Sequence, residues 1–320
     1  MELSQIYAPI QEDLIKVRDT LKSISRVDFA WLAEQLNHVL KETGKGLRPA
    51  LTLLSGKSFK YDLNYLLPMA VSVELMHTAT LVHDDAIDKA STRRGQKTIN
   101  SIWGDEIAIL MGDYLFAKAG EFVADTQTPR VVKLFSQTLG TISSGEIAQW
   151  RASYNPNQNR EDYFHRIYGK TASLFSLSTQ AGAILSKAPE ESVAIMKEYG
   201  DNLGIAFQII DDILDFTSTE EAMGKPVGSD LIQGTLTLPA MMLMERNPQD
   251  NPIRKFFETR DRQYVAQAIG MVLDTGTVKE CYGVAGEYRD RACRNLKSLP
   301  KAESRKSLTD LAEYIIKQGT

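Results

Sequence analysis

The sequence predicts an all-α fold that forms one helical domain over residues 1–320. Apolar residues recur every three or four positions in most segments, which is the spacing of one face of a helix. No run shows the strict apolar and polar alternation that would indicate a sheet. Prolines, which interrupt helices, are spread along the chain as in a helical bundle.

The apolar spacing predicts individual helices in order along the chain. Four segments carry the pattern most clearly: 13–22, 71–82, 107–115 and 134–142. In the first of them, Leu14, Val17 and Leu21 fall on one face. Residues 154–159 and 224–234 are rich in Asn, Gly or Pro and are expected to be loops, both too short to separate two domains.

The composition excludes several functional classes. With 43% hydrophobic residues and a net charge of −4, the chain is not expected to bind nucleic acid, because nucleic-acid-binding surfaces are basic. Residues 1–10 lack the features of a signal peptide, and no run approaches the ~18 apolar residues of a membrane span. The two cysteines, Cys281 and Cys293, show no C-x-x-C spacing, which favours a reduced, cytoplasmic location.

Two aspartate clusters share the spacing D-D-x-x-D. They comprise Asp84, Asp85 and Asp88, and Asp211, Asp212 and Asp215. On a helix, the first and last aspartates of each cluster would share one face. One such cluster is more often a solvated helix face than a site, but two clusters beside apolar runs require a counter-charge. Mg²⁺ supplies that charge and keeps coordination positions for phosphate oxygens, so the pair predicts a magnesium-dependent enzyme that acts on a diphosphate.

Basic residues occur in four groups that could bind phosphate. The groups are Lys45 with Arg48, Arg93-Arg94-Gly95, Gly169-Lys170-Thr171 and Gly224-Lys225-Pro226. The first group alone is better explained as a solvated loop. Adjacent arginines on a loop can turn in different directions and bind two different anions. The third group is not a P-loop, because Phe164 stands where that motif requires glycine.

Two histidines lie close to the first aspartate cluster. His77 and His83 are six residues apart, which excludes the H-E-x-x-H zinc pattern. His77 could donate a hydrogen bond to a phosphate, whereas His83 is equally well explained as a structural residue. No motif for covalent catalysis such as G-x-S-x-G is present.

As a set, these motifs resemble those of the trans-polyprenyl diphosphate synthases. The motifs are G-K-x-x-R-P (44–49), H-T-A-T-L-V-H-D-D-x-x-D (77–88), R-R-G (93–95), G-K-T (169–171) and F-Q-x-x-D-D-x-x-D (207–215). The resemblance spans about residues 41–239, and the segment 224–239 is similar to the bacterial medium- and long-chain branch. It implies an isoprenoid-synthase-type helical bundle around a deep central cavity, in a homodimer, with peripheral membrane contact at product release.

The resemblance also implies the reaction and its metal. An allylic diphosphate, farnesyl or geranylgeranyl diphosphate, would ionise, and isopentenyl diphosphate would attack the cation. Asp84, Asp88 and Asp211 would ligate three magnesium ions per active site, with Asp85, Asp212 and Asp215 as supporting residues. The departing diphosphate would take the final proton, which fits the absence of an evident dedicated base.

The remaining residue roles follow from the same resemblance. Arg93, Lys170 and Lys225 would complete the allylic diphosphate site. Lys45, Arg48, His77 and Arg94 would bind isopentenyl diphosphate, while Thr171 and Gln208 would turn their oxygens toward the allyl cation. The first loop departs from the family pattern G-G-K-R-x-R-P, because Thr43 replaces the first glycine and Gly46 the first arginine. One cation of the isopentenyl diphosphate site is therefore missing.

The product is expected to be an all-trans polyprenyl diphosphate longer than C20. In the resembled family, the residue five positions before the first cluster limits product length, and here it is Ala79, followed by Thr80. The first bulky side chain is Met76, one turn back, and Phe135 is a candidate for the floor of the tunnel. The first cluster also lacks the two-residue insertion of short-chain bacterial enzymes.

Two alternatives remain open from the sequence. A terpene cyclase or head-to-head condensing enzyme shares the magnesium chemistry but needs no second anion pocket formed by Lys45, Arg48 and Arg94. A non-catalytic regulatory subunit of a heteromeric synthase tends to lose one aspartate cluster, and both clusters are intact here.

Overall fold

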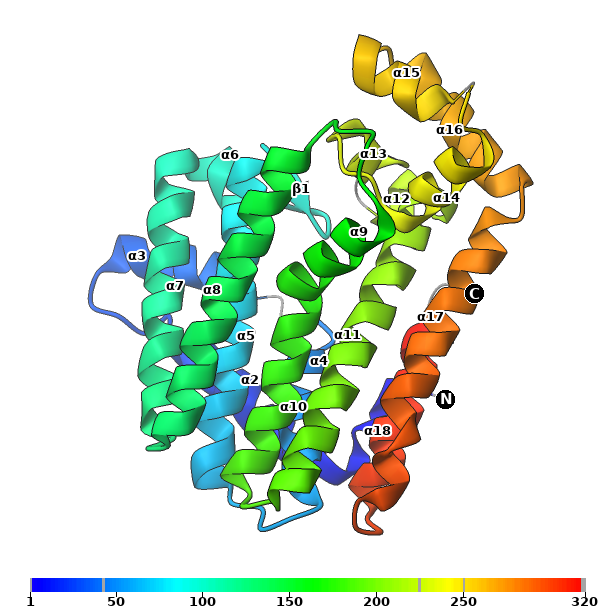
Figure 1. Cartoon of the computed structure of the whole chain (residues 1–320). Helices are drawn as coiled ribbons and strands as arrows, with labels where there is room; N and C mark the ends of the chain where they lie inside the picture. The colour runs from blue at the N-terminus through cyan, green and yellow to red at the C-terminus, as the bar shows by residue number, and fades with distance from the viewer. Residues whose placement is uncertain (1, 42–43, 224–225, 250, 318–320) are drawn as a thin grey trace. The chain divides into compact units, whose positions relative to one another are not determined.

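The structure is a computed structural model that describes residues 2–41, 44–223, 226–249 and 251–317. These residues are almost entirely helical, which confirms the predicted all-α class (Figure 1). They group into two compact units, each assembled from three stretches of chain. The first comprises Met1–Leu139, Leu174–Gly200 and Cys293–Leu311, and the second comprises Gly140–Ser173, Asp201–Ala292 and Ala312–Thr320. One domain over the whole chain stays a prediction.

Most helices lie wholly, or almost wholly, within one of the two units. The first contains α1 (Leu3–Ile6), η1 (Ala8–Ile10), α2 (Gln11–Ser23), α3 (Ala30–Leu40), α4 (Leu47–Lys57), α5 (Leu63–Ile87), α6 (Ile99–Trp103), α7 (Asp105–Asp125), η3 (Leu296–Ser298) and nearly all of α10 (Ser173–Leu185). The second contains α9 (Arg160–Ile167), the π-helix η2 (Tyr168–Ala172), α12 (Glu220–Met223), α13 (Ser229–Ile232), α14 (Leu238–Arg246), α15 (Pro252–Thr259) and α16 (Gln263–Asp274). Four helices contribute residues to both: α8 (Pro129–Ala152), α11 (Glu190–Thr217), α17 (Thr277–Arg294) and α18 (Glu303–Lys317).

Helix α5 is the core helix of the first unit. Every residue from Met69 to Met76 is buried, so this part of the helix is covered on all sides. Helices α4 and α7 pack against it, and α5 and α7 run side by side (Figure 1). The hydroxyl of Ser72 donates to the carbonyl of Ala119 at 2.8 Å, which satisfies a polar group that α5 buries.

Close approach of α5 and α7 depends on Gly112. A Cβ atom at this position would lie 2.1 Å from Nε2 of His83. The His83 ring therefore rests on the backbone of α7, where Nε2 lies 3.0 Å from the carbonyl oxygen of Ile109. This contact supports the structural interpretation of His83.

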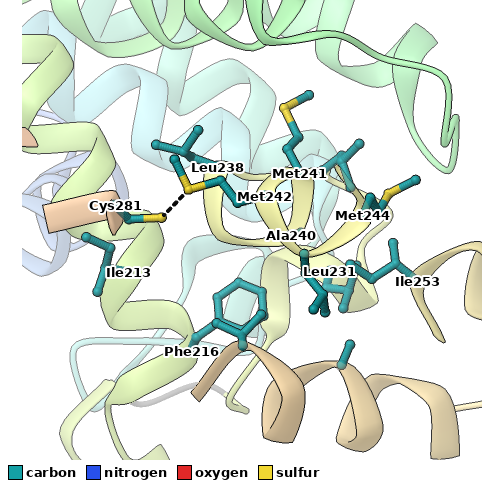
Figure 2. Packing of buried hydrophobic residues seen from close by; sticks show 14 of the residues in the cluster. Ile213, Phe216, Leu231, Leu238, Ala240, Met241, Met242, Met244, Ile253 and Cys281 are labelled. Atoms are coloured by element: carbon teal, nitrogen blue, oxygen red, sulfur yellow. Dashed lines mark hydrogen bonds between the residues drawn. The ribbon is translucent and has the colours of Figure 1, made fainter. Parts of the chain in front are cut away.

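The second unit has its own apolar core. It packs Ile213 and Phe216 of α11 against α13, α14 and α15 (Figure 2). Residues 238–244 of α14 are all buried. In the same core, the Cys281 thiol donates to the Met242 sulfur at 3.5 Å, and burial raises the pKa of Cys281 to about 12. Cys281 is thus an unreactive core residue.

Three local expectations need correction. Residues 92–97 form a short hairpin in which β1 (Thr92–Arg93) pairs with β2 (Gln96–Lys97), and two-residue strands are too short to produce an alternating pattern. Pro68 lies inside α5 rather than at its end. Pro49 is in the first turn of α4, where backbone N–H groups have no helical partner.

The third correction concerns the predicted loop 224–234, which contains the short helix α13. Asp215 stabilises the start of that helix. Its backbone carbonyl accepts from the N–H of Gly228 at 2.8 Å, and its side chain accepts from the N–H of Asp230 at 3.1 Å. The expected loop at 154–159 is confirmed, and it ends at a capping box formed by Asn159 and Asp162.

Helix α5 is also the one helix among the described residues that is long and apolar enough to cross a membrane. Its qualifying 18-residue window has a mean hydropathy of 1.3, and 61% of that window is buried inside the protein. Length and composition alone are weak evidence for a span, because buried core helices pass the same test.

Replacing Gly112 with alanine is expected to lower the free energy of unfolding by about 1–3 kcal/mol, because the new Cβ would overlap the His83 ring. Gly283 is the control, since nothing lies within 4 Å of a Cβ added there on α17. Gly283→Ala is expected to raise the free energy of unfolding by up to ~1 kcal/mol through helix propensity. Urea denaturation followed by circular dichroism measures both, and equal changes in the two variants would contradict this packing.

Candidate functional site

The first aspartate cluster lies at the C-terminal end of α5. Asp84 is partly exposed, Asp88 is exposed at the end of the helix, and Asp85 is buried. The negative end of the helix dipole lies here, so the site disfavours carboxylates unless cations accompany them. Asp84 and Asp88 are four residues apart, a spacing that falls on one face of a regular helix, while the buried Asp85 has a charged partner.

That partner is Arg93 on the hairpin. Its Nε donates to both carboxylate oxygens of Asp85, at 2.9 and 3.0 Å, and its Nη2 lies 2.8 Å from Oδ1. Burial lowers the pKa of Arg93, but the hydrogen bonds with Asp85 and the negative charges of Asp85, Asp84 and Asp88 together outweigh burial and raise it. Arg93 therefore remains charged and fixes the middle aspartate of the cluster.

Arg94 turns the other way because it occupies the hairpin turn. Both Arg94 (φ 51°) and Gly95 (φ 77°) have positive φ, as the two central residues of a type I′ turn require. The Arg94 guanidinium lies against Gly44, where a Cβ would be 2.6 Å from Nη1. The hairpin thus sends adjacent arginines to two different places, as the sequence predicted.

Arg48 and Arg94 lie near His77, and Lys45 lies near Arg94. The Arg48 side chain is buried, with its guanidinium carbon 5.1 Å from the centre of the Phe175 ring. Its Nε has no hydrogen-bond partner in the part of the chain that the structure describes. Burial lowers the pKa of Arg48 to about 10, with Arg94 adding to the shift and the nearby acid Glu74 opposing it.

The pKa values of Lys45 and His77 are lowered as well. Burial and Arg94 lower the pKa of Lys45. Burial, followed by repulsion from Arg48, Arg94 and Arg93, lowers the pKa of His77 well below its ordinary value, so His77 is neutral. A pocket of about 110 Å³ adjoins these groups, and its lining includes Gly44, Glu74, His77, Arg93 and Arg94. Partly desolvated cations beside a pocket form a site for an anion.

The second aspartate cluster lies in the last two turns of α11, in the second unit. Asp211 is exposed, whereas Asp212 and Asp215 are buried. The hydroxyl of Tyr163 donates to Oδ2 of Asp212 at 2.7 Å, and Nε2 of Gln208 donates to Oδ1 at 2.9 Å. Burial and Asp230 raise the pKa of Asp212 to about 7, against the effect of these two hydrogen bonds.

Lys170 and Thr171 lie in the π-helix η2 between α9 and α10. Lys170 forms a salt bridge with Glu146 of α8, with 2.8 Å between Nζ and Oε1. Thr171 donates to Oε1 of Gln208 at 2.6 Å. Single π-turns are rare and frequently mark functional sites.

Two residues beside this cluster and Lys170, Tyr163 and Glu146, belong to no recognisable motif in the sequence. Tyr163 reads as an ordinary core residue on an apolar helix face, and nothing in its neighbourhood signals a partner 49 positions away. Glu146 follows Gly145, and a glycine within a helix is a weak indication of a close helix contact. In the structure Gly145 packs closely on Gly169.

The structure places the proposed length-determining residues on α5 and α8. Met76 and Ala79 are fully buried, and Phe135 is nearly so. Thr80 is partly exposed and donates to the carbonyl of His77 at 2.7 Å. Their effect on product length stays a prediction. Lys225 lies outside the described residues.

Among the residues that the structure describes, no three His, Cys, Asp or Glu side chains form a group that could hold a metal ion. Asp84 and Asp88 in the first unit nevertheless offer the hard oxygen ligands that Mg²⁺ prefers, and Asp211 offers the same kind of ligand in the second unit. Mg²⁺ is usually held by one or two carboxylates together with water and substrate phosphates. The carboxylates of each cluster by themselves therefore fit a magnesium ion shared with a phosphate ligand.

Comparisons with known proteins agree on one family. The family model described as "Polyprenyl synthetase" matches residues 29–272. Component 2 of heptaprenyl diphosphate synthase from Bacillus subtilis is 37% identical over 99% of this chain and 91% of its own length. The crystal structure of heptaprenyl diphosphate synthase from Staphylococcus aureus superposes with a TM-score of 0.93, at 34% identity over 97% of this chain and 99% of that one. Polyprenyl synthase from Caulobacter crescentus, complexed with calcium and isoprenyl diphosphate, gives a TM-score of 0.94 at 28% identity, over 100% of this chain and 98% of that one.

Replacing Arg94 with glycine is expected to leave the free energy of unfolding unchanged or to raise it by up to about 1 kcal/mol. Glycine accepts the positive φ, and the change removes a charge that repels Lys45 and Arg48. Arg93→Gly, one residue away, is expected to destabilise the protein because it leaves the buried Asp85 without its partner. Chemical denaturation compares the two, and a loss of stability in Arg94→Gly as large as in Arg93→Gly would contradict this assignment.

Proposed function

The chain belongs to the polyprenyl synthetase family of prenyl-elongating enzymes, and we propose that it condenses isopentenyl diphosphate with an allylic diphosphate in a magnesium-dependent reaction. The allylic substrate is farnesyl or geranylgeranyl diphosphate, and the product is an all-trans polyprenyl diphosphate longer than C20. The names of the relatives support this length, because two of them are heptaprenyl diphosphate synthases.

One observation carries the proposal: Arg93 and Arg94 serve different partners. Arg93 holds Asp85 of the first aspartate cluster, while Arg94 joins the cations around His77. An elongating enzyme binds two diphosphates, so it needs two such anion sites. A terpene cyclase binds one and has no use for the second set of cations.

In the proposed mechanism, each site performs a separate task. Lys45, Arg48 and Arg94 bind the diphosphate of isopentenyl diphosphate, and neutral His77 donates a hydrogen bond to it. Arg48 approaches with its guanidinium on the Phe175 ring, which limits its freedom before the substrate arrives.

The acids serve the allylic diphosphate. Asp84, Asp88 and Asp211 would hold magnesium, which would supply positive charge to neutralise the leaving diphosphate. Asp85, Asp212 and Asp215 are buried and orient their neighbours. The salt bridge of Lys170 with Glu146 keeps that lysine extended toward the substrate until a diphosphate replaces Glu146 as its partner. Lys225 completes the site, and the oxygens of Thr171 and Gln208 stabilise the allyl cation.

A second candidate concerns assembly. The Bacillus subtilis relative is named component 2, which indicates a synthase of more than one component. Because this chain keeps both aspartate clusters, it would be the catalytic component of such a complex rather than a regulatory subunit.

A homodimer remains the simpler proposal, and Ile109 and Leu110, exposed on α7, provide an apolar surface for it. We place the enzyme in the cytoplasm, with membrane contact when the apolar product leaves.

The deciding experiment incubates the purified chain alone with labelled isopentenyl diphosphate, magnesium and a series of allylic primers. Chromatography of the extracted products by length is expected to show elongation beyond C20. Release of diphosphate from the primer without consumption of isopentenyl diphosphate would indicate a cyclase. No turnover alone, followed by turnover when a second component is added, would favour the heteromeric assembly.

Asp84→Asn is expected to lower kcat by at least about 100-fold, because it removes one carboxylate of a metal site while preserving its shape. Asp19→Asn, which makes the same charge change on an exposed part of α2, is the control and should retain normal turnover. Steady-state kinetics at saturating magnesium measures both. Near-normal rates for Asp84→Asn would remove the first cluster from the metal site.

Ala79→Tyr is expected to shorten the main product, because Ala79 lies ~7.5 Å of helix rise before Asp84 and a ring there would block the growing chain. Ala79→Leu should give an intermediate length. Chromatography of the prenyl products measures the distribution, and circular dichroism checks that this fully buried position tolerates each change. The same distribution in all three proteins would contradict the length assignment.

A further inference from the structure

Tyr163 of α9 is a fully buried tyrosine whose hydroxyl is committed to the second aspartate cluster. Its side chain is 0% exposed, and the hydroxyl donates to Oδ2 of Asp212 at 2.7 Å. The ring is fixed on both sides: Phe164 lies edge-on at 5.2 Å between centroids, and the Arg166 guanidinium carbon lies 5.6 Å from the ring centre. Arg166 is itself fixed, because it donates to the Leu236 carbonyl at 2.6 Å and to Gln158 at 2.8 Å.

Asp212, held by Tyr163, in turn fixes the orientation of the Gln208 side chain. The second carboxylate oxygen of Asp212 accepts from Nε2 of Gln208 at 2.9 Å, and the same nitrogen lies 3.4 Å from Oδ2 of Asp211. An ionised carboxylate only accepts hydrogen bonds, so with Asp212 ionised the amide nitrogen of Gln208 faces the aspartates and its oxygen faces away. That oxygen accepts from the hydroxyl of Thr171 at 2.6 Å.

The four side chains therefore form one directed chain of hydrogen bonds. Thr171 donates to Gln208, Gln208 donates to Asp212, and Tyr163 donates to Asp212 from the opposite side. A hydroxyl has one proton, so Thr171 can act toward any further ligand only as an acceptor. The chain keeps the negative end of the Thr171 hydroxyl available, which is the end that an allyl cation would attract.

We propose that Tyr163 is a positioning residue that fixes Asp212 and, through it, the orientation of Gln208 and Thr171. This inference rests on the proposed function for its catalytic consequence, because Thr171 and Gln208 face the cation only in that reaction. Without the Tyr163 hydroxyl, Oδ2 of Asp212 loses its buried donor, and Asp212 is free to rotate. Gln208 then loses the constraint that holds its amide nitrogen toward the aspartates.

Tyr163→Phe tests the proposal, because it keeps the ring and its contacts and removes only the hydroxyl. Tyr199→Phe is the matched control: Tyr199 is equally buried and donates at 2.7 Å to the backbone carbonyl of Leu308, in the first unit. The two variants are expected to lose similar thermal stability. Tyr163→Phe alone is expected to lower kcat about tenfold, the worth of one hydrogen bond to a charged group, with KM for isopentenyl diphosphate within about twofold.

A double-mutant comparison separates positioning from general destabilisation. If Tyr163 acts through Gln208, adding Tyr163→Phe to a Gln208→Leu protein should change kcat by less than about twofold, because the chain is already broken. Multiplicative losses in the double variant would overturn the proposal. So would a Tyr163→Phe protein whose kcat matches that of Tyr199→Phe.

A binding measurement keeps the test independent of catalysis. Thermal shifts recorded with inorganic diphosphate and increasing magnesium give the magnesium concentration for half-maximal stabilisation. That concentration is expected to rise several-fold in Tyr163→Phe and to stay at the wild-type value in Tyr199→Phe. If the wild-type chain consumes no isopentenyl diphosphate, either alone or with a second component, the proposed function fails, yet this arm still decides whether Tyr163 positions the cluster. Equal magnesium requirements in the two variants would then overturn it.

Discussion

Each aspartate cluster lies at the C-terminal end of its helix, α5 or α11. Within each cluster the carboxylates repel one another, and they oppose the negative end of that helix's dipole. Both helices meet this constraint in the same way. The middle aspartate of each cluster is buried and held by protein groups, Asp85 by Arg93, and Asp212 by Tyr163 with Gln208. The first aspartate of each cluster retains solvent exposure. Each cluster thus satisfies one carboxylate internally and leaves another accessible to a cation.

In the first unit, the cost of burying charge falls on basic side chains. Burial lowers the pKa of Lys45, Arg48 and His77, and repulsion from Arg94 lowers each of them further. At Arg48 the attraction of Glu74 is larger than this repulsion, so burial is what lowers its pKa. An anion in the adjoining pocket would stabilise the charged forms of these partly desolvated groups, so the cost of burying them returns as affinity for diphosphate.

Backbone irregularities carry the residues that serve these sites. The hairpin turn places Arg94 at positive φ, which separates its side chain from that of Arg93. The π-helix η2 interrupts the regular spacing between α9 and α10, and from it Lys170 turns to Glu146 while Thr171 turns to Gln208. In both places, neighbouring residues reach partners that a regular element would not offer to both.

The sequence by itself determined the helical class, the position of the main helices, both aspartate clusters and the adjacency of Arg93 and Arg94, whose separate roles stay a prediction. These features depend on residue types and spacings within one segment, which a sequence displays directly. Only the tertiary structure decided that Asp85 and Asp212 are the internally satisfied aspartates, that Glu146 is the partner of Lys170, and that Tyr163 holds Asp212. These contacts join separate elements, and one of them spans 49 positions. The identity of a buried donor depends on how helices pack, and periodicity within a single helix carries no information about that.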